Sequence, residues 1–461
     1  MTEEDKEARA DSLFEKGFEA YKQAQFRAAG EAFTAALSKY EALIAEGRAY
    51  FRSDCAITRM NLGNCLYELN NIEAARDLYE ETLKDYHFLI NKEKRSDLLS
   101  SYVRTRMNLG FCLYSLGEIE KAHTAYQETL KDYDTLIDKE KHTEWRPTRA
   151  RTRMNLGNCL YSLGDLEAAR MAYEETLKDY DTLIDKEKHT ELRPDRARTR
   201  MNLGNGLSEL CDLDAARGAY EETLKDYDLL INKENKTELW PDCAKTRMNL
   251  GICLKKIGDL DAARGAYQET IKNYDTLIEK EKRIDLRPDR ARTRMNLGIC
   301  LKKIGDLEAA RSSYEETLKD YDSLIDKEKH TELRPSRAIT RMNLGNCFYS
   351  IGDFKAARST YEETLKEYDI LIDKEKRTDL RPYRAITRMN LGNGLSELGD
   401  LDTGRRVYEE TLKEYEVLID KEKRTDLRPY RAITRMNLGN CLYELGDLKA
   451  ARRIYEETLK D

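Results

Sequence analysis

Apolar residues recur at helical spacing along the chain, and the segment 166–188 shows the pattern clearly. Its apolar positions are Leu166, Ala169, Tyr173, Leu177, Tyr180 and Ile184. Steps of three and four residues place these side chains on one face of an α-helix, whereas a strand would alternate. The charged residues between them predict a solvated opposite face. This segment is therefore predicted to form an amphipathic helix.

A second helix is predicted before this one, between Pro147 and Gly164. Proline suits the first turn of a helix, where its missing N–H costs no hydrogen bond, and Gly164-Asp165 separates the two helices. Apolar or small residues cover most of the circumference of this helix, which predicts burial on nearly all sides: Ala150, Met154, Leu156, Gly157, Cys159, Leu160 and Leu163. A narrow polar stripe remains, formed by Arg151, Asn155, Asn158 and Ser162. We expect this stripe to line a surface shared by all such first helices.

The two-helix unit recurs with a constant period of 47 residues. Nine methionines mark it: Met60, Met107, Met154, Met201, Met248, Met295, Met342, Met389 and Met436. A constant period of this size is typical of solenoid proteins. In an earlier, divergent copy, Gly17, Tyr21 and Ala29 align with Gly63, Tyr67 and Ala75, one residue out of phase. We predict ten repeats: a divergent first repeat in 1–50 and nine regular repeats in 51–461, the last of them truncated.

These repeats resemble the tetratricopeptide repeat, a helix-turn-helix unit. The matching residues are Leu156-Gly157, Leu160, Gly164, Leu166, Ala169, Tyr173 and Leu177, and the match recurs over nearly the whole chain. The long period and the Ala-x-Thr-x-x-Asn-Leu entry at 150–156 are similar to the kinesin-light-chain type of repeat, with an extended second helix. The resemblance implies an all-α fold, an α-solenoid wound as a right-handed superhelix. It also implies a concave groove lined by the first helices and a role as a protein-binding scaffold.

The polar stripe changes its chemistry along the chain. Residues separated by multiples of 47 occupy equivalent positions, which we call a column. The copies at Met248 and Met295 carry a basic set with apolar members, which we call the basic stripe: Lys245, Asn249, Ile252, Lys255, Lys256, Arg292, Asn296, Ile299, Lys302 and Lys303. Farther along, Glu397 and Glu444 make the stripe mildly acidic. We predict that the basic stripe binds a partner segment that is acidic and has an apolar anchor.

The columns of Asn155 and Arg153 each have the same residue in all nine regular copies. The column of Asn155 has two interpretations: its side chains either hydrogen-bond a neighbouring helix or loop, or hold the backbone of an extended peptide. The column of Arg153 lies on the packed side of the helix, at a position where the common repeat pattern has Trp. We predict that Arg153 pairs with a carboxylate of an adjacent helix and does not contact a ligand.

Cysteine offers no readable chemistry. Seven of the ten cysteines share one column, in which Gly206 and Gly394 also occur, so residue size is the common property. Successive helix layers are about 8 to 10 Å apart, beyond the roughly 7 Å Cα separation that a disulfide allows, so we expect free thiols. There is no Cys-x-x-Cys, and the histidines are scattered. We therefore predict no metal site and no cofactor.

Composition excludes several classes of function. A net charge of −7 and a pI near 5.7 argue against a nucleic-acid-binding surface, which is usually basic. The start of the chain lacks the pattern of a secretory signal, and no apolar run is long enough to span a membrane. We expect a cytoplasmic protein with no membrane partner. Paired glutamates such as Glu174-Glu175 point about 100° apart on a helix, which does not suit an acid–base pair, so we predict that the protein is not an enzyme.

The predicted function is a non-catalytic scaffold for protein–protein interaction. The alternative is a regulatory or adaptor subunit of an enzyme complex, with catalysis in another chain. A third reading, nucleic-acid binding, depends on the lysines of the basic stripe alone. Because the last copy stops within its second helix, near Leu448, Ala451 and Leu459, we also expect self-association through this uncapped end, or a natural continuation beyond it.

Overall fold

The computed structural model describes residues 3–139 and 141–459, and within them all regular structure is helical. The α-helices form ten successive helix–turn–helix pairs, as the repeat count predicts. Their bounds are α1 (Glu3–Lys22), α2 (Phe26–Ala45), α3 (Arg52–Glu68), α4 (Ile72–Asn91), α5 (Leu99–Ser115), α6 (Ile119–Asp134), α7 (Arg146–Ser162), α8 (Leu166–Asp181), α9 (Arg193–Glu209), α10 (Leu213–Asn232), α11 (Trp240–Ile257), α12 (Leu260–Lys280), α13 (Arg287–Ile304), α14 (Leu307–Asp322), α15 (Arg334–Ile351), α16 (Phe354–Asp369), α17 (Arg381–Glu397), α18 (Leu401–Glu416), α19 (Arg428–Glu444) and α20 (Leu448–Thr458). This is the α-solenoid fold that the sequence pattern predicts.

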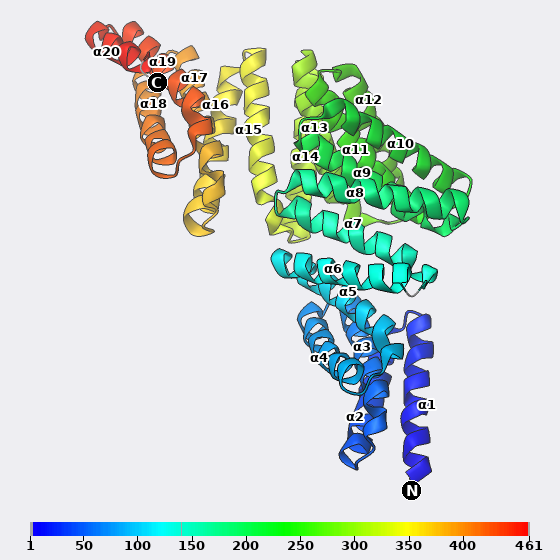
Figure 1. The fold of residues 1–461 in the computed structure, drawn as a ribbon. Coiled ribbons are helices and arrows are strands. Elements are labelled where there is room, and N and C mark those ends of the chain that lie inside the picture. The colour runs from blue at the N-terminus through cyan, green and yellow to red at the C-terminus, as the bar shows by residue number, and fades with distance from the viewer. Residues whose placement is uncertain (1–2, 140, 460–461) are drawn as a thin grey trace. The chain divides into compact units, whose positions relative to one another are not determined.

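The helices divide into two compact units at the boundary between Asn235 and Lys236. The N-terminal unit contains α1–α10 and the C-terminal unit contains α11–α20. Within each unit, every helix packs on the next one in the chain (Figure 1). Each layer of the solenoid therefore contacts mainly its neighbours in sequence.

Each pair begins and turns where the sequence predicts. A short 3₁₀ turn, Thr143–Trp145, precedes α7, and Pro147 lies in the first turn of that helix. Gly164 adopts a φ of 82°, a conformation that glycine tolerates, and forms the turn to α8. The side chain of Asp165 then accepts a hydrogen bond from the backbone N–H of Ala168 at 3.2 Å, which caps α8. Equivalent 3₁₀ turns occur at Ala49–Phe51, Ser96–Leu98, Thr190–Leu192, Thr237–Leu239, Ile284–Leu286, Thr331–Leu333, Thr378–Leu380 and Thr425–Leu427.

The second helices end differently from the prediction. A regular helix was expected to about Lys188, but α8 ends at Asp181 and continues as a π-helical turn, Thr182–Lys186. Similar π turns occupy Thr135–Lys139, Ser323–Lys327, Ile370–Lys374 and Val417–Lys421, whereas α4, α10 and α12 remain α-helical in the same region. Leu183 and Ile184 stay buried in the π turn. The wider turn thus preserves the apolar contacts from which the helix was predicted.

The core of each regular repeat depends on a close contact between a glycine and a tyrosine. A Cβ atom at Gly157 would lie 2.6 Å from Cε1 of Tyr173, so only glycine lets the ring lie across α7. A second cluster contains Ala150, Tyr180, Leu183 and Ile184. The prediction that Leu163 is buried is wrong. Leu163 is 41% exposed, because it follows the last residue of α7 and caps the helix end.

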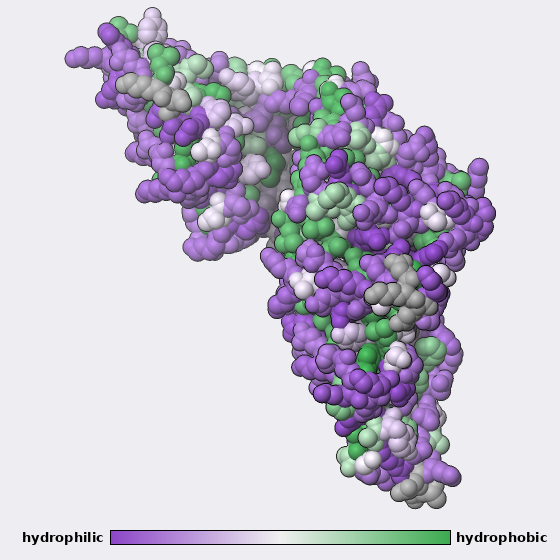
Figure 2. Space-filling view, in the orientation of Figure 1, coloured by the Kyte–Doolittle hydropathy of each residue, from purple (hydrophilic) through white to green (hydrophobic). Residues whose placement is uncertain are grey.

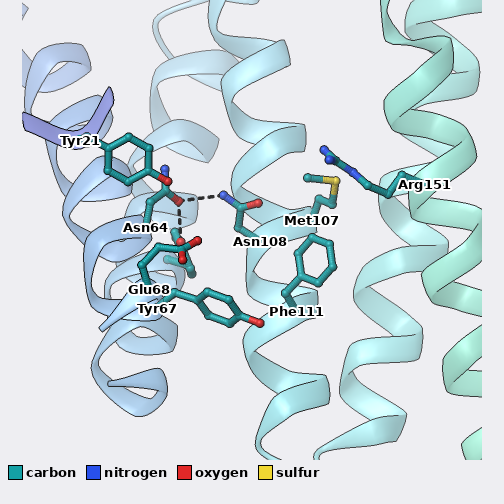
Figure 3. Close-up of a pocket in the computed structure, with 9 residues that line it drawn as sticks. Tyr21, Asn64, Tyr67, Glu68, Met107, Asn108, Phe111 and Arg151 are labelled. Carbon is teal, nitrogen blue, oxygen red and sulfur yellow. Dashed lines mark hydrogen bonds between the residues drawn. The ribbon is translucent and has the colours of Figure 1, made fainter. Parts of the chain in front are cut away.

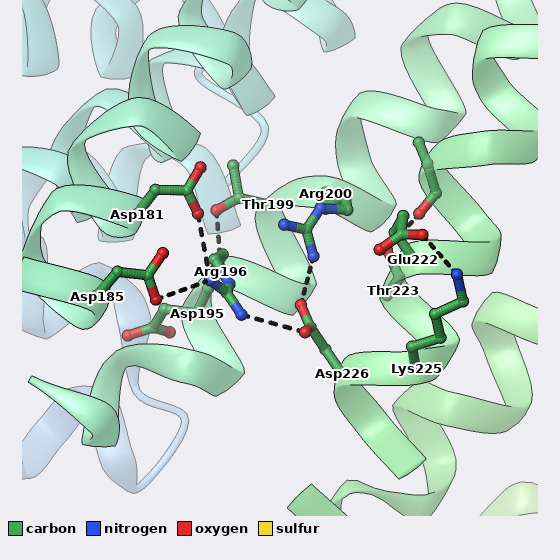
Figure 4. A network of polar contacts seen from close by, with 11 residues as sticks. Asp181, Asp185, Asp195, Arg196, Thr199, Arg200, Glu222, Thr223, Lys225 and Asp226 are labelled. Atoms are coloured by element: carbon green, nitrogen blue, oxygen red, sulfur yellow. Dashed lines mark hydrogen bonds and ion pairs between the residues drawn. The ribbon is translucent and has the colours of Figure 1, made fainter. Parts of the chain in front are cut away.

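The column of Arg153 forms the predicted ion pairs. In the N-terminal unit, Arg200 of α9 pairs with Asp226 of α10, and Arg196 bonds both Asp226 (3.1 Å) and Asp181 of α8 (3.2 Å) (Figure 4). The network therefore links three successive helices across two repeats. Arg153 itself pairs with Asp179. These residues have a structural role, as predicted.

The other structural expectations concern thiols and surface. None of the ten cysteines, all of which lie in the described ranges, forms a disulfide, and nine of them are buried. In the shared column, the Cys300 Sγ–H donates to the carbonyl oxygen of Leu260 at 3.3 Å. The visible surface is mostly hydrophilic (Figure 2). No helix in the described ranges combines the length and the apolar character that a membrane span requires.

Candidate partner-binding groove

The polar stripes of the first helices line a hollowed surface in each unit, which we call the groove. In the N-terminal unit, Asn158, Tyr161, Asn202 and Asn205 line a cavity of about 230 Å³. In the C-terminal unit, an equivalent cavity of about 210 Å³ is lined by members of the same columns, among them Asn393, Glu397, Asn437, Asn440 and Glu444. The structure therefore places the variable columns of the sequence on one surface within each unit.

Asparagines bond one another along the groove. The Nδ2 of Asn202 donates to the Oδ1 of Asn158 at 3.0 Å, and the same oxygen accepts a hydrogen bond from the Tyr173 hydroxyl at 2.8 Å. The same arrangement joins Asn108 to Asn64, Asn390 to Asn346 and Asn437 to Asn393. The Asn155 column thus bonds the neighbouring repeat, which is the structural one of its two interpretations. The sequence analysis did not assign Tyr173 to the groove, because the apolar pattern places its ring in the core. Its hydroxyl nevertheless reaches the groove.

Phe111 interrupts this ladder of asparagines. It occupies the column of Asn158, so the next asparagine, Asn155, finds no acceptor there. Asn155 is 6% exposed, and its Nδ2 has no hydrogen-bond partner among the described residues. An unsatisfied buried amide destabilises the fold by about 1–3 kcal/mol. Phenylalanine at position 111 therefore lowers the stability of the fold locally, because it leaves the amide of Asn155 without an acceptor.

The basic stripe brings two lysines of adjacent repeats together. Burial, followed by the positive charges of Lys303 and Lys256, lowers the pKa of Lys255. In an earlier pair of copies, Tyr114 and Ser162 occupy the positions equivalent to Lys255 and Lys303. Their hydroxyl oxygens lie 3.1 Å apart, within hydrogen-bond distance. Two lysines at these positions repel instead. An anion between them would relieve the repulsion.

Other members of the stripe fall into two groups. Lys302 lines a cavity of about 240 Å³ together with Asn346, Tyr349 and Ser350, and burial lowers its pKa. Ile252 and Ile299 are half-buried in the columns that hold asparagine elsewhere, and Lys245 is exposed. By contrast, the fold already uses two of the predicted residues. Asn296 is 8% exposed, and Arg292 pairs with Asp289 at 2.6 Å.

Two thiols of the shared cysteine column are chemically quiet. Burial raises the pKa of the Cys112 and Cys159 thiols to about 12, which keeps both protonated and unreactive. Within 3–139 and 141–459, no three His, Cys, Asp or Glu side chains are grouped so as to hold a metal ion. The residues that line the groove offer charge, hydrogen bonding and apolar contact.

The chain matches the family model described as tetratricopeptide repeat over residues 14–87, 112–184, 201–278, 258–325, 303–369 and 389–461. No curated protein is similar enough in sequence to count as a match. Among solved structures, the apo form of RapI has 15% sequence identity and a TM-score of 0.56, over 88% of this chain and 96% of RapI. BtubC (BKLC) from P. vanneervenii has 19% identity and a TM-score of 0.43, over 54% of this chain and 91% of BtubC. A putative kinesin light chain with nearly identical TPR-like repeats, from Podosopora anserina, has 15% identity and a TM-score of 0.37, over 47% of this chain and 93% of that protein.

Proposed function

Because the chain belongs to the tetratricopeptide repeat family, we propose that it is a scaffold that binds a segment of a partner protein in its groove. Repeats of this family generally serve as non-catalytic interaction scaffolds. Stacked repeats provide an extended surface for binding rather than an enclosed active site. The partner segment binds at the basic stripe and is acidic, with an apolar side chain as its anchor.

One observation carries this assignment: Lys303 lies close enough to Lys255 for its positive charge, together with burial, to lower the pKa of Lys255. Neither lysine has an ion pair with a carboxylate among the described residues. A carboxylate from a partner would neutralise both, and charge-assisted bonds of this kind are the strong ones at interfaces. Ile252 and Ile299, between the lysines, support an apolar anchor beside the acidic residues.

The test uses a labelled peptide of glutamate and glycine with one central leucine, measured by fluorescence anisotropy. We expect binding that weakens as salt rises. Changing Lys255, Lys256, Lys302 and Lys303 to Glu should weaken it by at least about tenfold, mainly through slower association and lost charge pairing. Unchanged affinity of this variant at low salt would refute the site.

A matched control changes the net charge by the same amount elsewhere. Four exposed lysines on the outer helices of the C-terminal unit serve this purpose: Lys272, Lys319, Lys366 and Lys413. Changing them to Glu should alter affinity far less, because screening weakens charges on the opposite side of the solenoid. Equal losses in the two variants would show that net charge, and not the basic stripe, attracts the peptide. An oligonucleotide in the same assay, over a salt series, tests the nucleic-acid reading.

A further inference from the structure

A larger cavity lies in the groove of the N-terminal unit, whereas the basic stripe belongs to the C-terminal unit. Its volume is about 360 Å³, against about 230 Å³ for the next cavity of the same unit's groove. Residues of four first helices and one second helix line it (Figure 3). They are Tyr21, Asn64, Tyr67, Glu68, Tyr79, Met107, Asn108, Phe111 and Arg151, and we call this space the aromatic cavity.

One of its walls is aromatic where most other copies have asparagine. Phe111 replaces the asparagine of its column, and its ring packs edge-on against Tyr126, with centroids 6.0 Å apart. Tyr21 comes from the divergent first repeat and packs edge-on against Phe26 at 5.5 Å. Tyr21, Tyr67 and Phe111 are each only half-buried. Apolar ring surface therefore faces the cavity, and a side chain that covered it would gain by removing it from water.

Two opposite charges border this apolar space. Glu68 lies beside Tyr21, and its negative charge adds to burial in raising the pKa of the Tyr21 hydroxyl. Arg151 lies on the far side, beyond Met107 and Phe111 (Figure 3). Neither Glu68 nor Arg151 has an ion pair among the described residues.

The sequence explains why Arg151 remains without a carboxylate. In the next three copies the residue three positions earlier is aspartate, and Arg292 pairs with Asp289 in this way. Before Arg151 that position is Thr148. Its guanidinium is thus available to an external carboxylate, as the carboxylate of Glu68 is to an external cation.

We propose that the aromatic cavity binds an apolar or aromatic side chain of an extended partner segment, with a basic residue of that segment at Glu68 and an acidic residue at Arg151. The inference rests on the proposed function as a scaffold, but it adds a second binding site with a different charge requirement. A segment of mixed charge suits this cavity, whereas the basic stripe suits an acidic one.

The test uses blocked peptides with a central phenylalanine, flanked by one lysine and one glutamate in both orders. Matched peptides carry two lysines, two glutamates or a central alanine. We expect the full chain to prefer the mixed-charge phenylalanine peptide, in one of its orders. Three variants test the lining residues: Phe111→Asn, Glu68→Ser and Arg151→Ile. Each new residue occurs at the equivalent position of another copy, so we expect the variants to fold.

Phe111→Asn should weaken the preferred peptide by about tenfold, since it removes one aromatic wall. Glu68→Ser should remove the preference for lysine, and Arg151→Ile the preference for glutamate. No preference in the wild type, or unchanged affinity in a folded Phe111→Asn chain, would overturn the proposal. Lys255→Tyr with Lys302→Tyr should leave this peptide unaffected while weakening the acidic one, so that each site can fail separately.

Discussion

At the scale of single residues, two glycines of α9 serve opposite purposes although they are two positions apart. A Cβ at Gly204 would meet Cε1 of Tyr220 at 2.8 Å, whereas a Cβ at Gly206 would have no neighbour within 4 Å. Gly206 occupies the column in which most copies have cysteine. The first glycine is required for packing, and the second leaves space unfilled.

We therefore predict opposite effects of the same substitution. Gly204→Ala should lower the free energy of unfolding by about 1–3 kcal/mol through overpacking. Gly206→Ala should raise it by about 0.5–1 kcal/mol, because alanine favours the helix and fills empty space. Urea unfolding followed by circular dichroism measures both. The packing account would be wrong if the two variants shifted the midpoint in the same direction.

One repeat lacks the carboxylate that others use to bind arginine. Asn273 stands at the position of Asp320, which pairs with Arg294 in the next copy. Buried nitrogens of both Arg247 (Nη1) and Asn273 (Nδ2) have no hydrogen-bond partner among the described residues. Arg247 keeps one carboxylate contact, Glu269 at 3.3 Å. The repeat that begins the C-terminal unit is thus less well satisfied.

Asn273→Asp should stabilise the protein by about 1–2 kcal/mol, because it supplies a charged acceptor to a half-buried guanidinium. The converse change, Asp320→Asn, should destabilise it. Thermal unfolding at neutral pH compares the two variants with the wild type. A lower midpoint for Asn273→Asp would contradict the expected pairing.

The ion pairing of the Arg153 column could be predicted from the sequence for a physical reason. An arginine that faces the packed side in every copy must be neutralised, so a carboxylate partner could be inferred. Its identity, Asp179, could not, because that residue resembles the other acidic residues of the second helix. Leu163 was misassigned because periodicity does not show where a helix ends.

At the scale of elements, aspartate caps most second helices of the array. Asp306 accepts a hydrogen bond from the backbone N–H of Ala309 at 3.2 Å at the start of α14. Asp400 occupies the same position before α18 but makes no such bond; it lies 3.6 Å from Arg358 instead. The two residues therefore form a matched pair that separates capping from charge.

Asp306→Ala should cost about 0.5–2 kcal/mol of stability, the usual value of a lost helix cap. Asp400→Ala should cost less, since an exposed ion pair contributes about 0–1 kcal/mol. Hydrogen exchange should show faster opening in the first turn of α14 for Asp306→Ala, with little change in distant repeats. Equal effects of the two substitutions would argue against a specific cap at Asp306.

The ends of the second helices show what periodicity cannot resolve. Both an α-helical and a π-helical turn keep Leu183 and Ile184 against the core, so their spacing fits either one. The copies with a π turn share the letters Leu-Ile-Asp-Lys, while α10 has Leu-Ile-Asn-Lys and α12 has Leu-Ile-Glu-Lys. The turn is π-helical where the third of these four residues is aspartate and α-helical where it is asparagine or glutamate. A prediction based on apolar residues alone cannot distinguish the two.

At the scale of the whole molecule, two columns of buried tyrosine run through the solenoid. Burial raises the pKa of Tyr133 and of Tyr321 to about 12, and it also raises the pKa of Tyr180, Tyr274 and Tyr368 above the ordinary value. An unfolded tyrosine ionises near pH 10. The folded state therefore resists an ionisation that the unfolded chain accepts.

This difference predicts unfolding at high pH. Below about pH 10 tyrosine is neutral in both states, and its contribution to stability is complete. Between about pH 10 and the raised values, only the unfolded chain loses protons, so stability falls as pH rises. Tyrosinate absorbance and helical circular dichroism should change together in a titration. Full ionisation near pH 10 with the helices intact would contradict the burial of these hydroxyls.

The aromatic cavity could not be predicted from the sequence, and its origin explains why. Its distinctive residues come from different copies: Tyr21 from the first, Phe111 from the third and Arg151 from the fourth. Only Phe111 departs from its column, because Tyr21 aligns with Tyr67 and arginine recurs in the column of Arg151. A single copy therefore does not show that these three residues lie near one another. The basic stripe was recognisable because its lysines recur in two successive copies. Repetition reveals a site only when the site itself is repeated.

The constant period also determines how such a gene can change. Bonds between copies join positions a fixed distance apart, as Asn202 joins Asn158 and Tyr114 joins Ser162. Recombination between two copies aligned in register inserts or deletes 47 residues and leaves every such separation intact. A slip that is not a multiple of this period disrupts the register of the copies on either side of it. A lineage can therefore lengthen or shorten this protein in single steps, and each step adds or removes one set of groove residues in a framework that still folds.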